Sequence, residues 1–239
     1  MPESDRNLML SLQGVSAGYF KKWVIRSVDL DVFSNDVVAV LGPNGSGKST
    51  LIKAILGLVD SVDGKVVFKG KNITGQAHHK SVRDGVSYLL QDRNVFTCLS
   101  VRDNLRLAGF GMEEHRQFQN DVLDILPEIK SMLGRRAGLL SGGERQMLAV
   151  AMVFMRRPIL AILDEPSAGL STGLVTRVMQ NIREFNRRYR MTFIISEQNI
   201  RAVLEVATRV VIMKNGGLHE SPDFRTRLLQ DNLKEIFFS

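Results

Sequence analysis

The chain has 239 residues, a formal net charge of +7 and a single cysteine, Cys98. Hydrophobic residues make up 44% of it and charged residues 24%, which is typical of a globular protein with room for one large domain. No apolar run approaches the ~18 residues of a membrane-spanning helix, and the polar residues 1–5 predict no signal peptide. A lone cysteine excludes an internal disulfide and favours a reducing cytosol. The basic residues form short clusters without stacking aromatic residues, so we expect solvated helix faces rather than a nucleic-acid surface.

The first third of the chain has the pattern of strands. Apolar residues alternate with polar ones near residues 8–12 and 28–32, and a continuous apolar run covers residues 37–41. Apolar residues at helical spacing follow from Leu51. Asp63-Gly64 precedes a further strand at 65–68, which we expect to join an antiparallel layer, and another strand covers 86–90.

The segment between strand 37–41 and the helix is the most informative one. It consists of Gly42, Pro43, Asn44, Gly45, Ser46, Gly47, Lys48, Ser49 and Thr50, which fits the phosphate-loop pattern G-x-x-x-x-G-K-[ST]. The glycines let backbone N–H groups turn towards a phosphate, and the helix N-terminus adds a partial positive charge. Lys48 adds a full charge near the β- and γ-phosphates, and Ser49 offers a hydroxyl to Mg²⁺. The segment predicts a nucleoside triphosphate site, against the alternative of a glycine turn that happens to precede a lysine.

Helical spacing dominates residues 92–155. One helix begins after Ser100, and apolar positions 118, 122, 125 and 129 form a stripe that Pro127 interrupts. After residue 158 strands and helices alternate again, with strands at 159–163, 192–195 and 209–213 and helices at 173–188 and 200–207. Asn215-Gly216-Gly217 predicts a hairpin turn.

The strand near residue 160 ends in two carboxylates, Asp164 and Glu165. In phosphate-loop proteins such a strand lies beside the phosphate-loop strand. We therefore predict that Asp164 serves the Mg²⁺ ion through water or the Ser49 hydroxyl. Glu165 would activate the water that attacks the γ-phosphate. The alternative is a pair of acidic residues that end a strand in a solvated turn.

Residues 141–146, which we call the signature segment, admit two compatible interpretations. Ser141 followed three residues later by Glu144 is a capping box, and we expect it to start a helix at 146–155. Gly142 and Gly143 also expose N–H groups at the start of a helix, which suits a phosphate.

The phosphate loop, Gln91, the signature segment and residues 160–166 resemble, in this order and spacing, the ATP-binding cassette (ABC) family over nearly the whole chain. The resemblance implies an α/β fold: a P-loop NTPase core of ABC type with an antiparallel β subdomain and an inserted α-helical subdomain. Residues 1–239 would form one ATP-binding domain, with 1–91 and 156–239 as the core and 92–155 as the helical subdomain. It also implies a head-to-tail dimer in which ATP lies between one phosphate loop and Ser141, Gly142 and Gly143 of the other subunit.

Single residues also match the family. Tyr19 matches the aromatic residue that stacks on adenine, the alternative being an ordinary strand-edge aromatic. Gln91 matches the glutamine that contacts Mg²⁺ or the attacking water, the alternative being a polar residue that ends a strand. Residues 167–171 match the loop that crosses the dimer, although its usual Asp is missing.

Residues 196–199 depart from the family pattern, because most members have a histidine where this chain has Gln198. An amide can donate a hydrogen bond to phosphate but carries no charge, which would weaken this contact by about 1–2 kcal/mol. The sequence Glu-Gln-Asn here, together with residues 93–105, resembles the cassette subunits of importers for branched-chain amino acids and of related amide and urea systems.

The resemblance thus implies an ATPase subunit that powers such an importer with ATP and Mg²⁺, peripheral at the cytoplasmic face of the cell membrane. Its partners would be a second copy or a related cassette, integral-membrane permease subunits and, indirectly, a periplasmic solute-binding protein, with no nucleic acid. Two alternatives stay open. One is a soluble single-cassette ATPase that acts in assembly without a permease, and the other, motivated by Gln198, is a weakly hydrolytic regulatory subunit.

Overall fold

The computed structural model describes residues 7–91, 94–111, 116–220 and 226. The predicted starting residue of the helical segment, Asp92, and Arg93 lie outside this part of the chain. Two sheets share the described residues, a six-stranded one and a four-stranded antiparallel one. This arrangement, with helices inserted between two strands of the larger sheet, confirms the predicted α/β class.

The larger sheet has the strand order β10-β9-β3-β8-β7-β6. Its strands are β3 (Val37–Leu41), β6 (Val86–Leu89), β7 (Leu160–Asp164), β8 (Thr192–Ser196), β9 (Arg209–Lys214) and β10 (Gly217–Glu220). All neighbours are parallel except the β9–β10 hairpin, so β3, β6, β7 and β8 end at the same edge. In open parallel sheets this carboxyl edge is where ligands bind.

The smaller sheet has the order β2-β1-β4-β5, with β1 (Leu8–Tyr19), β2 (Lys22–Phe33), β4 (Ser61–Phe68) and β5 (Lys71–Asn72). It confirms the expected antiparallel layer but corrects one position, because Asp63-Gly64 lies inside β4 and not before it. The register of β1 against β4 shifts between Gln13 and Ser16, and Gly64 has a φ of 82° there. The pair is therefore part of a bulge, which glycine permits.

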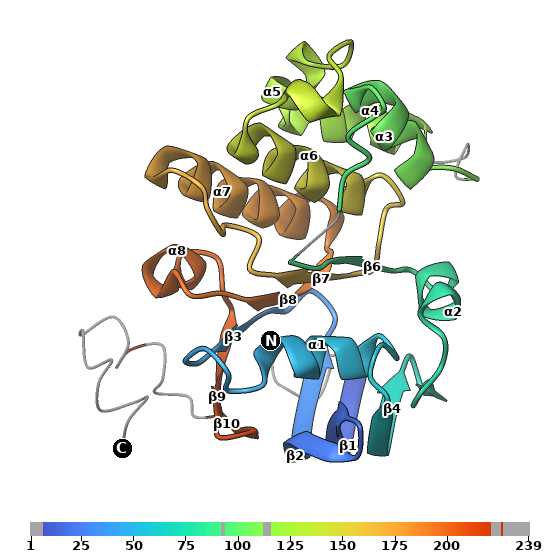
Figure 1. Cartoon of the computed structure of the whole chain (residues 1–239), viewed down its shortest axis with the longest axis vertical. Coiled ribbons are helices and arrows are strands. Elements are labelled where there is room, and N and C mark those ends of the chain that lie inside the picture. The colour runs from blue at the N-terminus through green and yellow to red at the C-terminus, as the bar shows by residue number, and fades with distance from the viewer. Residues whose placement is uncertain (1–6, 92–93, 112–115, 221–225, 227–239) are drawn as a thin grey trace.

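Helices cover both faces of the larger sheet (Figure 1). On one side lie α1 (Lys48–Ile55) and the smaller sheet, and on the other lie α6 (Gly142–Phe154) and α7 (Thr172–Tyr189). The remaining helices are α2 (His78–Arg83), α3 (Val101–Ala108), α4 (Arg116–Ile125), α5 (Pro127–Ser131), the 3-10 turn η3 (Ala137–Leu139) and α8 (Ile200–Leu204). The helices α3 to α6 all come from the chain between β6 and β7, and they stand together at one end of the molecule (Figure 1).

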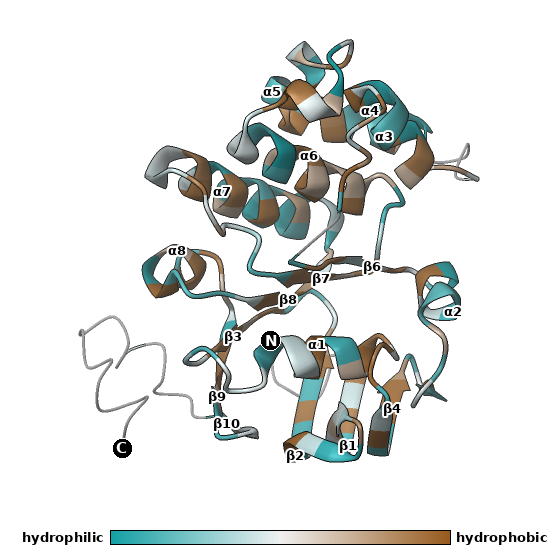
Figure 2. Cartoon of the chain, in the orientation of Figure 1, coloured by the Kyte–Doolittle hydropathy of each residue, from teal (hydrophilic) through white to brown (hydrophobic). Residues whose placement is uncertain are grey.

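Alternation along the buried strands builds two cores. Val37, Ala39 and Leu41 pack with the helical side, whereas Val38 and Val40 pack with α1 and the smaller sheet. Figure 2 shows the result, since the strands of the larger sheet are hydrophobic while the helices carry polar outer faces. A sheet buried on both faces needs such continuously apolar strands.

Two helices differ from the prediction in their bounds, and a third was not predicted. The signature helix begins at Gly142 and not at 146, because the capping box places Ser141 at the N-cap and leaves both glycines inside the first turn. The helix predicted at 200–207 ends at Leu204. Helix α2 was not predicted, because only one of its six residues, Ser81, is buried and it therefore has no apolar stripe.

Candidate functional site

The phosphate loop leaves β3 and enters α1 at the carboxyl edge of the larger sheet. Gly47 has a φ of 108°, and Gly42 lies so close to β9 that a Cβ on it would be 2.3 Å from the Met213 carbonyl oxygen. Both positions therefore require glycine. The loop is closed by bonds from Ser46 N to the Pro43 carbonyl and from Leu51 N to the Gly47 carbonyl.

Lys48 stabilises this loop from inside. Its Nζ donates to the Gly42 carbonyl at 2.9 Å and to the Pro43 carbonyl at 3.2 Å, and the residue is only 5% exposed. Burial lowers the pKa of Lys48, while the charges of Glu165 and Asp164 act in the opposite direction. The ammonium group is thus held beside the loop, at the position from which a P-loop lysine reaches phosphate.

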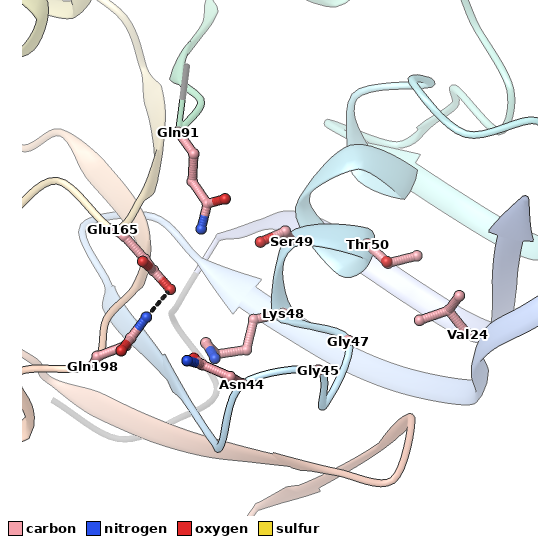
Figure 3. A pocket seen from close by; sticks show the side chains of 10 residues that line it. All are labelled: Val24, Asn44, Gly45, Gly47, Lys48, Ser49, Thr50, Gln91, Glu165 and Gln198. Carbon is pink, nitrogen blue, oxygen red and sulfur yellow. Dashed lines mark hydrogen bonds between the residues drawn. The ribbon is translucent and has the colours of Figure 1, made fainter. Parts of the chain in front are cut away.

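A cavity of about 340 Å³ opens above the loop (Figure 3). Gln91 points into it from the end of β6, on the side of Ser49. Residues from the phosphate loop, from β2 and from the segments that follow β6, β7 and β8 line the cavity: Val24, Asn44, Gly45, Gly47, Lys48, Ser49, Thr50, Gln91, Glu165 and Gln198. Most of the residues predicted for one nucleotide site therefore lie around one cavity.

Glu165 and Gln198 lie side by side in the lining of this cavity, opposite the phosphate loop (Figure 3). The Gln198 Nε2 donates to Glu165 Oε1 at 2.6 Å, which joins the ends of β7 and β8. Glu165 has a φ of 51°, in the left-handed region that a glutamate rarely adopts. Of the non-glycine residues described with a positive φ, Glu165 is the one that lines this cavity, and backbone strain is often retained at functional sites.

Asp164 lies deeper than Glu165. It is buried at the end of β7 and accepts a hydrogen bond from the Ser196 hydroxyl. It does not line the cavity, and neither do Gly42, Pro43 or Ser46.

The signature segment lies outside this cavity in its own chain, because none of Ser141, Gly142 and Gly143 lines it. Both bonds of the predicted capping box are present: Ser141 N donates to the Glu144 carboxylate at 2.7 Å, and Glu144 N donates to Ser141 Oγ at 3.2 Å. Since Ser141 Oγ accepts there, its hydroxyl proton is left for another acceptor. A Cβ on Gly142 would meet no atom within 4 Å, so this side of the helix start is open.

Tyr19 does not line the cavity, although it lies on the hairpin next to it. The Lys53 ammonium lies over the Tyr19 ring, 5.9 Å from its centroid. Val24, which faces the cavity from β2, was not predicted, because an apolar strand residue carries no sign of a ligand contact. Glu197, a carboxylate that is only 2% exposed beside Gln198, was not predicted as a functional residue either.

A second cavity of about 280 Å³ lies between β6 and the helical segment. Its lining includes Tyr88, Phe96, Met152 and Arg156, and Phe96 remains 54% exposed. Arg156 donates to the Phe110 carbonyl at 3.3 Å, but its buried Nε has no hydrogen-bond partner among the residues that the structure describes. This cavity, which we call the groove beside β6, is therefore lined by apolar side chains and by one guanidinium N–H that has no acceptor in the described part of the chain.

Comparisons with known proteins agree with this geometry. The profile of the ABC transporter family matches residues 25–168. The chain is 38% identical over 210 residues to the probable branched-chain amino acid transport ATP-binding protein LivF of Archaeoglobus fulgidus, covering 87% of this chain and 89% of that one. It is 33% identical to the high-affinity branched-chain amino acid transport ATP-binding protein BraG of Pseudomonas aeruginosa, covering 87% and 90%.

Among solved structures, the ADP conformation of an ATP-binding cassette of an ABC transporter superimposes with a TM-score of 0.82 at 26% identity, covering 96% of this chain and 98% of that one. Within the described residues, no helix is both long and apolar enough to span a membrane. The family profile, the long alignments and the phosphate-loop cavity agree: the chain belongs to the ABC transporter family and is one of its ATP-hydrolysing cassettes.

Proposed function

We propose that this cassette powers an importer for branched-chain amino acids or related amides. The observation that carries its enzymatic part is the Glu165–Gln198 pair, which faces the phosphate loop across one cavity. The solute class rests on the similarity to LivF and BraG, whose names state branched-chain amino acid transport.

In this proposal the triphosphate of ATP lies on the phosphate loop, with its γ-phosphate towards Glu165. Lys48 neutralises phosphate charge, Glu165 accepts a hydrogen bond from the attacking water, and Gln198 holds that carboxylate in place. Adenine would lie against Val24 and stack on Tyr19. Catalysis then depends mainly on positioning and charge neutralisation.

The residues present fit a magnesium ion. The described part of the chain has no cluster of three or more His, Cys, Asp and Glu side chains, and Mg²⁺ in ATPases typically uses few protein ligands besides phosphate oxygens. Ser49, Gln91 and Asp164 would hold the ion, directly or through water. When bound, it would neutralise charge on the transferred phosphate.

The position of the signature segment supports a dimer. Its open helix start, with Ser141, Gly142 and Gly143, lies away from the cavity of its own chain, so its anion-binding groups are free for the ATP of another subunit. We propose that a second copy or a related cassette supplies this contact head to tail.

The groove beside β6 would receive a cytoplasmic helix of a permease subunit, with Arg156 facing a polar or acidic group of that helix. Residues 92–155 would form the helical subdomain that carries most of this surface. The protein would then work at the inner face of the cell membrane, and a periplasmic solute-binding protein would act on it only through the permease.

The decisive experiment has two parts. ATP hydrolysis of the wild type is compared with that of Glu165→Gln and of Glu205→Gln, an exposed control. Only Glu165→Gln is expected to lose at least 100-fold in kcat, and equal rates would reject Glu165 as the base. The protein is then purified from detergent extracts. Membrane subunits that support leucine uptake would confirm the importer, whereas a soluble partner would indicate an assembly ATPase.

A further inference from the structure

Glu197 is a buried carboxylate to which the mechanism above gives no role. It follows β8 directly, is 2% exposed, and has no basic side chain paired with it anywhere in the described ranges. Burying an unpaired carboxylate is costly unless several hydrogen bonds satisfy it. Its surroundings should therefore explain why a charge is kept there.

Backbone N–H groups satisfy this carboxylate on both sides. Oε1 accepts from Ser167 N at 2.9 Å, and Oε2 accepts from Gln198 N at 3.0 Å and from Asn199 N at 3.2 Å. Hydrogen bonds to an ionised acceptor are stronger than neutral ones, so these three contacts offset much of the cost of burial.

The backbone groups that bond to the two oxygens of Glu197 lie next to Glu165 on one side and at Gln198 on the other. Ser167 lies in the turn that follows Glu165, and this turn is closed by a bond from Ala168 N to the Glu165 carbonyl at 3.1 Å. Gln198 is the other half of the pair. One carboxylate thus bridges the turn after β7 and the turn after β8, the two turns whose residues Glu165 and Gln198 meet in the cavity.

We propose that Glu197 is a positioning residue for ATP hydrolysis, whose ionised carboxylate fixes the distance between the backbones that carry Glu165 and Gln198. This inference rests on the proposed function only in taking Glu165 as the group that acts on water. The ionised form is required because only a carboxylate accepts at both oxygens. A glutamine there can accept on one side only, and its NH₂ group would face N–H donors on the other.

Glu197→Gln tests this role with almost no change in volume. We expect kcat to fall about 10- to 100-fold, because misplacement of a reacting group by an ångström has effects of this size. The KM for ATP should change less than twofold, since the hydrogen bonds of the Glu197 side chain within the described residues go to Ser167, Gln198 and Asn199 and not to the phosphate loop. Glu205→Gln, an exposed change of the same type seven residues on from Gln198, should leave both constants unaltered.

A double-mutant cycle separates positioning from general stability. If Glu197 acts through Gln198, the substitution Glu197→Gln should cost at most about threefold in a Gln198→Ala background, because coupled groups are not additive. Full additivity, or a wild-type kcat in Glu197→Gln, would overturn the proposal. The binding of a fluorescent ATP analogue checks that each variant is folded.

If Glu197→Gln does not fold, Glu197→Asp carries the test, since it keeps the charge but shortens the reach by one methylene. A lower kcat at unchanged KM supports the role, and a wild-type kcat rejects it. A wild type without ATPase activity, or an active Glu165→Gln, would instead reject the proposed function. The two failures are therefore distinguishable.

Discussion

Glu165 combines two properties that rarely occur in one residue, a left-handed backbone and a side chain directed at the cavity. Its amide N donates to the Ser196 carbonyl at 2.9 Å, so β8 holds this backbone in place. A left-handed conformation costs a residue with a Cβ roughly 1–2 kcal/mol. The site thus keeps a local conformation that lowers stability.

Replacing this residue should show that cost. Glu165→Gly is expected to be more stable than Glu165→Ala by about 0.5–1 kcal/mol, because relief of the left-handed strain exceeds the added chain entropy of glycine. Urea unfolding of the ligand-free variants measures the difference. At Glu205, whose φ is −65°, the alanine variant should instead be more stable than the glycine variant. An alanine variant at 165 that is at least as stable as the glycine variant would contradict the argument.

At the scale of elements, the start of α6 depends on a charge. Glu144 accepts from Ser141 N, and the Arg135 guanidinium donates to it at 2.8 Å. The backbone bond from Ser141 first, and then the bond from Arg135, lower the pKa of Glu144. Arg135 also donates to the Leu139 carbonyl, so it contacts the chain on both sides of Ser141.

This arrangement predicts a pH dependence. Because the folded state lowers the pKa of Glu144, the stability that its charge contributes is complete above the pKa of the unfolded state, about 4.3. This stability is lost as the pH falls through the lower pKa of the folded state. The melting temperature of the wild type should therefore exceed that of Glu144→Gln at pH 6, and the gap should narrow below about pH 4. Thermal unfolding between pH 3 and 7 measures this. A gap that does not depend on pH would show that the charge plays no part.

At the scale of the whole molecule, the two sheets meet behind the phosphate loop at Gly216, in the turn of the β9–β10 hairpin. Gly216 N donates to the Ser46 carbonyl at 3.1 Å, and Arg26 N donates to the Gly216 carbonyl at 2.9 Å. One residue thus connects the phosphate loop with β2, the strand that contains Val24 and pairs with the end of β1 at Tyr19. A Cβ on Gly216 would be 2.2 Å from the Val24 carbonyl oxygen.

Gly216→Ala should therefore displace the β1–β2 hairpin, against which adenine lies in the proposed function, relative to the phosphate loop. We expect the Kd for ATP to rise about tenfold, corresponding to about 1.4 kcal/mol, and the Kd for inorganic tripolyphosphate to rise less. Gly217→Ala is the matched control, because its Cβ would be 3.5 Å or more from its neighbours. Competition with a fluorescent nucleotide measures both constants for the wild type and for each of the two variants. An equal loss for both ligands would place the damage in the loop itself.

The sequence predicted most of this molecule because its strongest patterns are local. The phosphate loop, the apolar strands and the capping box each depend on neighbours along the chain, and the structure has all three. Val24, Glu197 and the role of Gly216 could not be predicted, since each acts through a contact with a distant segment. Helix α2 was missed for the opposite reason, as it buries too little surface to leave a periodic pattern.

The separation of the signature segment from the cavity has a genetic consequence. In the proposed dimer, a lesion at Ser141 leaves the phosphate loop of its own chain intact and disables the site of its neighbour. When mutant and normal chains are made together, mixed dimers therefore keep one working site, formed by the mutant phosphate loop and the normal signature. A chain with a defective Lys48 should rescue a chain with a defective Ser141, although neither functions alone.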